Sequence, residues 1–300
     1  MPYSPQNRNA RKHRPSVGVA LGGGGARGIA HIGVLRVLER EGIPVDCLAG
    51  TSIGGIVAAG YASGMTPDQL EDEAKKTTTM RRMLQLADPG PLKHGLLRGK
   101  RLQAYFDERM GHKTFNDLVI PLAIVCVDLN ARQEAVITEG SLSLAVRATI
   151  SVPGLFMPVE HRDQRLVDGG LLNNVPVSAV RQLGADVVIA VDVEPDPQDP
   201  THARFTSNRW MPEGLTRTFA TMDEAISLLL AKVQENYLQQ FPPDVVIRPE
   251  IPAGINVLSG YNRVVELIRA GEHCAQAALP ELRGVLASVQ GTREIGRQQH

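Results

Sequence analysis

Two short apolar runs near the start of the 300-residue chain each lead through a glycine-rich turn into a segment of helical pattern. Residues 16–21 and 43–49 predict buried strands, because they are short and apolar. Residues 28–41 predict a helix whose apolar positions recur at helical spacing, and residues 53–63 predict a second helix made mainly of small residues. Strand, turn and helix in repeated order are typical of an α/β fold with a largely parallel sheet.

The same alternation continues toward the carboxyl end. Further strands are expected at 119–128, 134–138, 165–168, 186–192 and 245–248, and further helices at 176–183, 215–240 and 260–289. In the less regular stretch 66–115, Pro67 indicates a helix start. Ser141 is expected to cap a helix that ends before Pro153, since the residue before a proline avoids helical geometry.

The domain organisation is expected to be simple. Polar, proline-rich residues 195–213 are typical of a mobile loop or lid. The expected division is a flexible basic tail at 1–14, one domain at 15–289 with its motifs in 16–193 and its last helices in 215–289, and a flexible tail at 290–300.

Composition excludes several classes of protein. Lys+Arg and Asp+Glu both number 32, and this balance predicts no nucleic-acid partner, since phosphate binding relies on excess positive charge. Three scattered cysteines predict neither a disulfide framework nor a zinc site, and they favour a cytoplasmic location. No apolar run reaches the roughly 18 residues that cross a bilayer. Basic residues nevertheless precede the first acidic one, Glu39, and this asymmetry permits transient peripheral contact with the inner membrane surface.

Gly50, Ser52 and Gly54 fit the pattern GxSxG, between an expected strand and an expected helix. A nucleophile elbow needs small residues on both sides of the serine, because the serine backbone is strained and the strand and helix approach closely. The pattern also occurs in ordinary strand-to-helix turns of glycine-rich chains. Its position favours the catalytic interpretation, in which Ser52 is a nucleophile.

A second glycine-rich turn, Gly22–Gly28, also joins a strand to a helix. Consecutive glycines let backbone N–H groups converge on an anion, and a helix amino terminus adds a favourable dipole. One candidate anion is a dinucleotide pyrophosphate, since residues 23–28 fit GxGxxG and Asp46 lies near the spacing of a ribose-binding acid. The other is an oxyanion formed during acyl transfer. Ser52 favours the oxyanion, because a cofactor site has no need of a serine elbow on the next strand.

A serine nucleophile needs a base, and the usual Ser–Asp–His order requires a histidine. The candidates stand in a polar turn, a loop, a helix and the terminus, away from any glycine-rich context: His161, His202, His273 and His300. Asp168-Gly169-Gly170, by contrast, places a carboxylate on a tight loop at a strand end, although the same pattern is common in surface turns.

Together these residues resemble the patatin-like phospholipase family over most of 16–193. Three signatures of the family occur in order, namely the loop Gly22–Gly28, the elbow Gly50–Gly54 and the stretch Asp168–Gly170. Residues 148–156 are similar to the family's proline-containing block before the catalytic aspartate. Residues 166–177 are most similar to the bacterial and neuropathy-target-esterase-like branch, while plant members usually carry alanine where this chain has a glycine at position 170.

The resemblance implies a three-layer α/β/α fold and a Ser–Asp dyad without histidine. Ser52 is expected to attack an ester carbonyl and Asp168 to accept the serine proton. The remaining implied site residues are the oxyanion-hole glycines Gly23, Gly24 and Gly25 with Arg27 in support, and the motif glycines Gly28, Gly50, Gly54, Gly169 and Gly170. No metal or cofactor is expected, because the acidic residues 71–73 have the pattern of a solvated helix face rather than of calcium ligands.

The implied activity is hydrolysis of carboxylic ester bonds in a phospholipid or lysophospholipid. Acyl transfer to an alcohol through the same acyl-enzyme, and a non-catalytic lipid-binding or regulatory module, are the alternatives. Residues 80–86, or the loop with Phe205, Trp210 and Met211, are expected to line the lipid's route or to contact a membrane surface, unless they pack on the core or on a partner subunit. The sequence does not determine the head group, the acyl-chain length or the oligomeric state.

Overall fold

A computed structural model describes residues 14–90, 97–194, 213–255 and 260–298 of the chain. The loop expected to form a lid, with Phe205, Trp210 and Met211, lies outside the described residues. The expected basic tail also lies outside them, except for Arg14, whose guanidinium binds the Asp46 carboxylate at 2.6 Å.

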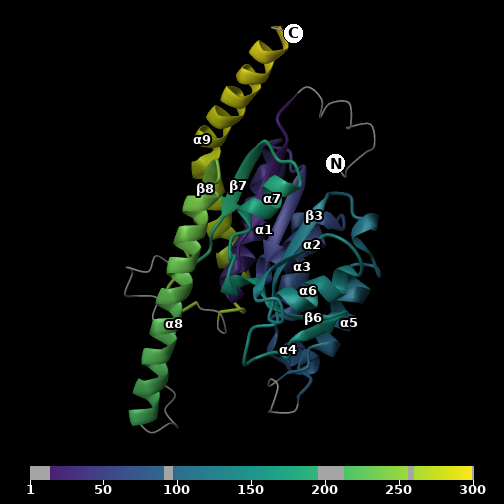
Figure 1. The fold of residues 1–300 in the computed structure, drawn as a ribbon, viewed down its shortest axis with the longest axis vertical. Coiled ribbons are helices and arrows are strands. Elements are labelled where there is room, and N and C mark those ends of the chain that lie inside the picture. The colour runs from purple at the N-terminus through teal and green to yellow at the C-terminus, as the bar shows by residue number, and fades with distance from the viewer. Residues whose placement is uncertain (1–13, 91–96, 195–212, 256–259, 299–300) are drawn as a thin grey trace.

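The described strands form one mixed, eight-stranded sheet in the order β5-β6-β3-β2-β1-β7-β8, with β4 paired to β3 (Figure 1). The strands are β1 (Val17–Leu21), β2 (Cys47–Thr51), β3 (Leu122–Asp128), β4 (Gln133–Ile137), β5 (Val159–His161), β6 (Gln164–Asp168), β7 (Val187–Val191) and β8 (Val245–Ile247). The five neighbours from β3 through β8 pair in parallel, whereas β4, β5 and β6 pair antiparallel. The largely parallel sheet is therefore confirmed.

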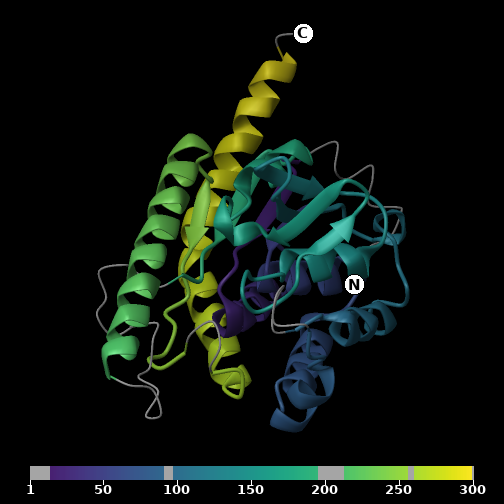
Figure 2. The same cartoon turned by 60° about the horizontal axis from the view of Figure 1, so that its bottom comes forward.

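Helices cover both faces of this sheet, as Figures 1 and 2 show. The helices are α1 (Ala30–Arg40), α2 (Ile53–Ala62), α3 (Pro67–Thr77), α4 (Met80–Leu86), α5 (Lys100–Arg109), α6 (Leu142–Thr149), α7 (Val177–Gln182), α8 (Glu213–Gln240) and α9 (Val264–Gln298). Because side chains alternate along a strand, Val19 of β1 packs toward α1 and α9, while Ala20 packs toward α7. The result is the expected three-layer α/β/α arrangement.

Local sequence signals account for several element boundaries. Thr66 and Gln69 form a reciprocal capping box at the start of α3, where Pro67 was expected to open a helix. Ser141 caps α6, since its Oγ accepts a hydrogen bond from Leu144 N at 3.3 Å.

Several boundaries differ from expectation: β3 begins at Leu122 rather than at residue 119, α9 begins at Val264 rather than at residue 260, and two further differences have a visible cause or consequence. Strand β2 begins at Cys47 rather than at Ile43, because Ile43 N donates to Leu38 O in the turn that ends α1. Helix α9 continues through Gln298, so residues 290–298, expected as a flexible tail, are helical. This helix lies so close to α1 that a Cβ at Gly33 would come 2.0 Å from the carbonyl oxygen of Ile268.

No helix in the described ranges is both long enough and apolar enough to cross a membrane.

Candidate active site

Strand β3 brings the carboxyl ends of two other strands together. Thr51, the last residue of β2, pairs with Val125, and Asp168, the last residue of β6, pairs with the following residue, Cys126. Strand β4 pairs with one edge of β3 at both Val125 and Cys126. Strands β2 and β6 therefore share the other edge of β3, along which they run toward each other. Their carboxyl ends therefore meet, and the residue after Thr51 faces Asp168.

That residue is Ser52, and its side chain binds the aspartate directly. Ser52 Oγ donates a hydrogen bond to Asp168 Oδ2 at 2.6 Å. The backbone of Ser52 has φ 54° and ψ −125°, a conformation that costs an L-residue energy, and Ser52 N is held by Thr149 Oγ1 at 2.8 Å. A Cβ at Gly54 would lie only 2.2 Å from the carbonyl oxygen of Leu21. The turn is thus the strained, closely packed elbow that GxSxG predicts.

Asp168 is buried, and two backbone contacts fix its position. Its Oδ1 accepts a hydrogen bond from Gly170 N at 2.8 Å, and its own N–H donates to Ser151 O at 3.1 Å. Burial raises the pKa of Asp168 to about 6, although the hydrogen bonds from Ser52 and Gly170 favour the charged form. Such a carboxylate is ionised at neutral pH and is a stronger base than a free aspartate.

No histidine in the described part of the chain hydrogen-bonds to either Ser52 or Asp168. Of the histidines considered from the sequence, His161 lies in β5 and His273 in α9, and His202 and His300 lie outside the described residues. The geometry therefore offers Asp168 as the base for Ser52.

Sequence reasoning missed His31, which is fully buried in the first turn of α1. Burial lowers its pKa to about 4, so the imidazole is neutral at physiological pH. Its Nε2 lies 2.7 Å from the carbonyl oxygen of Gly22 and donates to it. A polar residue on an otherwise apolar helix face, one turn after the glycines, is the signal that would have identified it.

Side chains hold three consecutive carbonyl groups of the glycine loop. The contacts are His31 Nε2 to Gly22 O at 2.7 Å, Asn174 Nδ2 to Gly23 O at 3.4 Å and Arg27 Nε to Gly24 O at 3.0 Å. In a trans peptide the C=O and N–H groups point in opposite directions. Each contact consequently also orients the N–H group of the following glycine.

Only part of the expected oxyanion hole has free donors. Gly23 N already donates to the carbonyl oxygen of Asn174 at 3.1 Å, so this N–H group is not available. Among the described residues, the N–H groups of Gly24 and Gly25 have no acceptor, and Gly25 begins the short 3-10 helix Gly25–Ile29 before α1. The glycine loop lies next to Ser52, since a Cβ built on Gly23 would lie 3.2 Å from Ser52 Cβ. The N–H groups of Gly24 and Gly25 can therefore face an anion beside Ser52.

Arg27 contributes by holding the loop. Its side chain is 2% exposed, and Nη2 binds both carboxylate oxygens of Glu194 at 2.9 Å while Nε binds Gly24. The Arg27 side chain thus ties the carbonyl of Gly24 to Glu194.

The dinucleotide interpretation of the glycine loop fails on the position of Asp46. Asp46 precedes β2, and its carboxylate binds Arg14 and accepts from Val17 N at 2.9 Å. It therefore lies at the amino ends of the strands, whereas the glycine loop follows the carboxyl end of β1. A ribose-binding acid would have to lie at the carboxyl ends.

The acidic residues of α3 are less exposed than expected. Glu71 binds Arg36 and Lys75 at 2.6 Å, and Glu73 accepts a hydrogen bond from Tyr105 at 2.6 Å, so these carboxylates link α3 to α1 and α5. The described residues contain no group of three or more His, Cys, Asp or Glu that could hold a metal ion.

Helix α8 anchors the loop that follows Asp168. Gln234 Oε1 accepts hydrogen bonds from Asn174 N at 3.1 Å and from Val175 N at 3.3 Å. Tyr237, one turn later, accepts from Asn173 Nδ2 at 2.6 Å. The same loop supplies the Asn174 groups that bind Gly23, so α8 supports both halves of the site.

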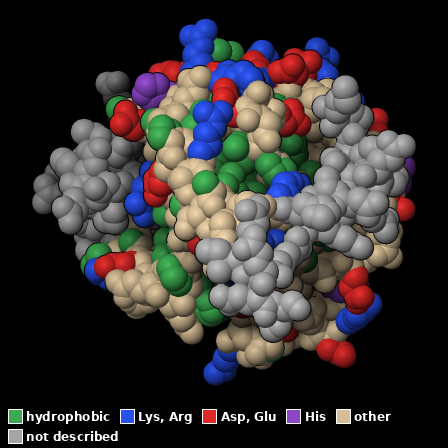
Figure 3. Space-filling model, turned by 90° about the horizontal axis from the view of Figure 1, so that it is seen from above, with side chains coloured by type: hydrophobic (Ala, Val, Ile, Leu, Met, Phe, Trp, Pro, Cys, Tyr) green, Lys and Arg blue, Asp and Glu red, His purple; other side chains and the backbone are tan. Residues whose placement is uncertain are grey.

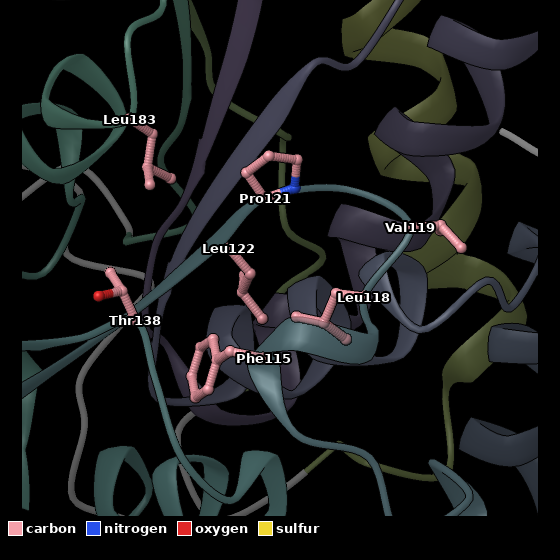
Figure 4. Close-up of a pocket in the computed structure, with 7 residues that line it drawn as sticks. All are labelled: Phe115, Leu118, Val119, Pro121, Leu122, Thr138 and Leu183. Carbon is pink, nitrogen blue, oxygen red and sulfur yellow. The ribbon is translucent and has the colours of Figure 1, made fainter. Parts of the chain in front are cut away.

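A hollow of about 330 Å³ lies at the opposite end of the sheet (Figure 4). Its lining is mainly apolar and consists of Phe115, Leu118, Val119, Pro121, Leu122, Thr138 and Leu183. Leu122 is the first residue of β3, so the hollow lies at the amino ends of the parallel strands and apart from the dyad. Figure 3 views this end of the molecule, where hydrophobic side chains gather near the middle and charged ones surround them.

Comparison with known proteins shows which family the chain resembles. The family model described as patatin-like phospholipase matches residues 19–181. An uncharacterized NTE family protein of Mycobacterium tuberculosis is 34% identical over 212 residues, which are 70% of this chain and 58% of the relative. Human patatin-like phospholipase domain-containing protein 6 is 35% identical over 185 residues, 59% of this chain and 13% of the relative.

Among solved structures, VipD from Legionella pneumophila superposes with a TM-score of 0.49 at 13% identity, over 89% of this chain and 67% of that one. The chain thus spans only part of the length of the relatives that it matches. Because the family model covers more than half of its residues, the chain belongs to the patatin-like phospholipase family.

Proposed function

We propose that this protein is a serine acyl hydrolase that cleaves carboxylic ester bonds of phospholipids or lysophospholipids. The observation that carries the proposal is the 2.6 Å hydrogen bond from Ser52 Oγ to a buried Asp168 whose pKa is raised to about 6. A serine needs such a base, because its hydroxyl is a weak nucleophile while it holds its proton.

In the proposed reaction, Ser52 Oγ attacks the ester carbonyl and its proton passes to Asp168 Oδ2. The negative charge that develops on the carbonyl oxygen is stabilised by the N–H groups of Gly24 and Gly25. As the alcohol leaves, it takes the proton from Asp168. Water then attacks the acyl-serine and gives a proton to Asp168, which passes it to Ser52 Oγ as the bond between Oγ and the acyl carbon breaks, so the carboxylic acid is released and the free serine is restored. Attack by an alcohol in place of water would give acyl transfer.

The test is hydrolysis of a short-chain nitrophenyl ester by the unmodified chain and by Ser52→Ala, together with labelling by a fluorophosphonate. We expect Ser52→Ala to lose both hydrolysis and labelling. Ser63→Ala is the matched control, since Ser63 lies at the end of α2, where its Oγ binds only the helix backbone, and this variant should retain both. Labelling that survives in Ser52→Ala would contradict the proposal.

A further inference from the structure

Positive charge gathers around α4 and the start of α5, in a protein whose formal net charge is zero. Between residues 75 and 101, the described Lys and Arg residues are Lys75, Lys76, Arg81, Arg82, Arg98, Lys100 and Arg101, and the one described acid is Asp88. Asp88 is directed at backbone rather than at these cations, because its carboxylate accepts from the N–H groups of Gly99, Lys100 and Arg101.

Within the described ranges, most of these cations have no carboxylate partner. Lys75 and Lys76 bind acids of their own helix. Among the residues that the structure describes, no carboxylate forms an ion pair with Arg81, Arg98 or Lys100, and all three are exposed. Like charges that repel one another without compensation favour a partner of the opposite sign.

Three of these cations line an open hollow on the surface. Its volume is about 410 Å³, and Lys76, Thr79, Arg81, Arg82 and Gln85 line it. The Arg82 guanidinium stacks over the Tyr105 ring at 4.9 Å and donates to Gln85 Oε1 at 3.2 Å, so its position is fixed before any ligand arrives. Arg101 Nη1 donates to Ala87 O at 3.2 Å and thereby ties the start of α5 to the end of α4.

This basic surface lies at the same end of the sheet as the dyad. The Arg98 carbonyl accepts from Arg147 Nη2 at 2.6 Å, and Arg147 Nη1 donates to Ser151 Oγ at 2.6 Å. Ser151 O in turn accepts from Asp168 N at 3.1 Å. Two side chains therefore separate the basic surface from the proposed base. Figures 1 and 2 show α4 at the lower end of the molecule, away from the carboxyl terminus of α9.

We infer that the surface formed by Lys76, Arg81, Arg82, Arg98, Lys100 and Arg101 docks the protein on an anionic phospholipid bilayer, with the dyad facing the lipid. The choice of a lipid occupant rests on the proposed function. In a bilayer the ester groups lie just beneath the layer of phosphates, within the few ångströms of the polar region. Cations that contact phosphates at this end of the sheet thus bring ester groups to the end where Ser52 lies.

The experiment measures sedimentation of the full chain with vesicles, in a Ser52→Ala background that removes acyl transfer from the measurement. One vesicle set contains phosphatidylcholine alone, and the other also contains phosphatidylglycerol. Arg81→Gln with Lys100→Gln removes two exposed cations of the basic surface. The matched control, Arg40→Gln with Arg283→Gln, removes two exposed cations beside Glu41, at the opposite end of α1 from the glycine loop.

We expect binding to the phosphatidylglycerol vesicles that weakens at high salt. Each cation near an anionic surface contributes about fivefold to partitioning, so the Arg81/Lys100 double variant should bind about 25-fold more weakly while the control double variant binds normally. Equal binding to phosphatidylcholine alone, or an equal loss in the control, would overturn the inference. Thermal unfolding of each variant checks that the fold is retained.

The outcomes also separate this inference from the proposed function. A chain that hydrolyses the soluble ester but ignores anionic vesicles refutes docking alone. A chain that binds these vesicles through the basic surface but carries no reactive serine refutes the proposed function alone.

Discussion

Replacing Asp168 with asparagine should abolish hydrolysis and at the same time stabilise the folded protein at neutral pH. Asp168 is 6% exposed, and burial raises its pKa from 3.8 to about 6. The folded state therefore holds this proton more tightly than the unfolded state, and ionising the carboxyl group at neutral pH costs folding free energy. Asparagine keeps an oxygen that accepts from Gly170 N but carries no charge.

The size of the effect follows from the difference of about 2 pKa units, each of which corresponds to about 1.4 kcal/mol. Unmodified protein should lose about 3 kcal/mol of stability from this group as pH rises from about 4 through about 6, and no more above that. Asp168→Asn should not show this loss. The variant should thus be more stable by up to about 3 kcal/mol at pH 7 and nearly equal in stability at about pH 4, and its Tm should rise by roughly 5 °C or more at neutral pH.

Urea unfolding followed by far-ultraviolet circular dichroism, at a series of pH values, measures this difference. Asp72→Asn, on the exposed side of α3, controls for the change of residue type and should show no such pH-dependent gain. If Asp168→Asn is less stable than the unmodified protein at neutral pH, or if the difference is the same at every pH, the carboxylate is not a destabilising buried charge and the argument for its basicity fails.

Three further predictions concern the reaction. The kcat/KM for a soluble ester should fall tenfold per pH unit below about 6, because Asp168 must be ionised to accept the serine proton; a rate that stays constant down to about pH 4 would contradict this. His31→Leu should lower kcat by about tenfold with little change in KM, because the peptide between Gly22 and Gly23 loses the hydrogen bond that His31 donates to Gly22 O. His31→Gln should recover part of the rate, since its amide can still donate to Gly22 O. Equal losses in both variants would show that His31 acts only through packing. Treatment with a metal chelator should leave the rate unchanged, and a marked loss would point to an ion that the proposed reaction does not use.

The sequence predicts the fold well where local signals decide the outcome. Pro67 and Ser141 mark helix starts because capping is a property of a few neighbouring residues. The order of strands and helices follows from the alternation of short apolar runs with amphipathic segments. Strand β2 was placed too early because the turn that ends α1 uses Ile43, and this hydrogen bond is not visible in an apolar pattern.

The site was predictable in its motifs and less so in its contacts. That Ser52 and Asp168 lie side by side depends on two strands meeting along one edge of β3, which no local pattern encodes. The engagement of Gly23 N by Asn174 O and the contact of His31 with Gly22 likewise join residues through tertiary packing. Motifs therefore identified the two residues that the proposed reaction uses, whereas the groups that orient them required the structure.

The anchoring by α8 of the loop after Asp168 means that the family motifs cover less of the chain than the proposed active site requires. Gln234 and Tyr237 lie well beyond residue 181, where the match to the family model ends. A chain truncated at residue 194 would retain every motif but would leave Asn174 N and Val175 N without their acceptor. Changes in this helix are therefore expected to alter the support of the proposed site while the motif sequence stays constant, so two chains with identical signature residues need not hold the Asp168 loop in the same way.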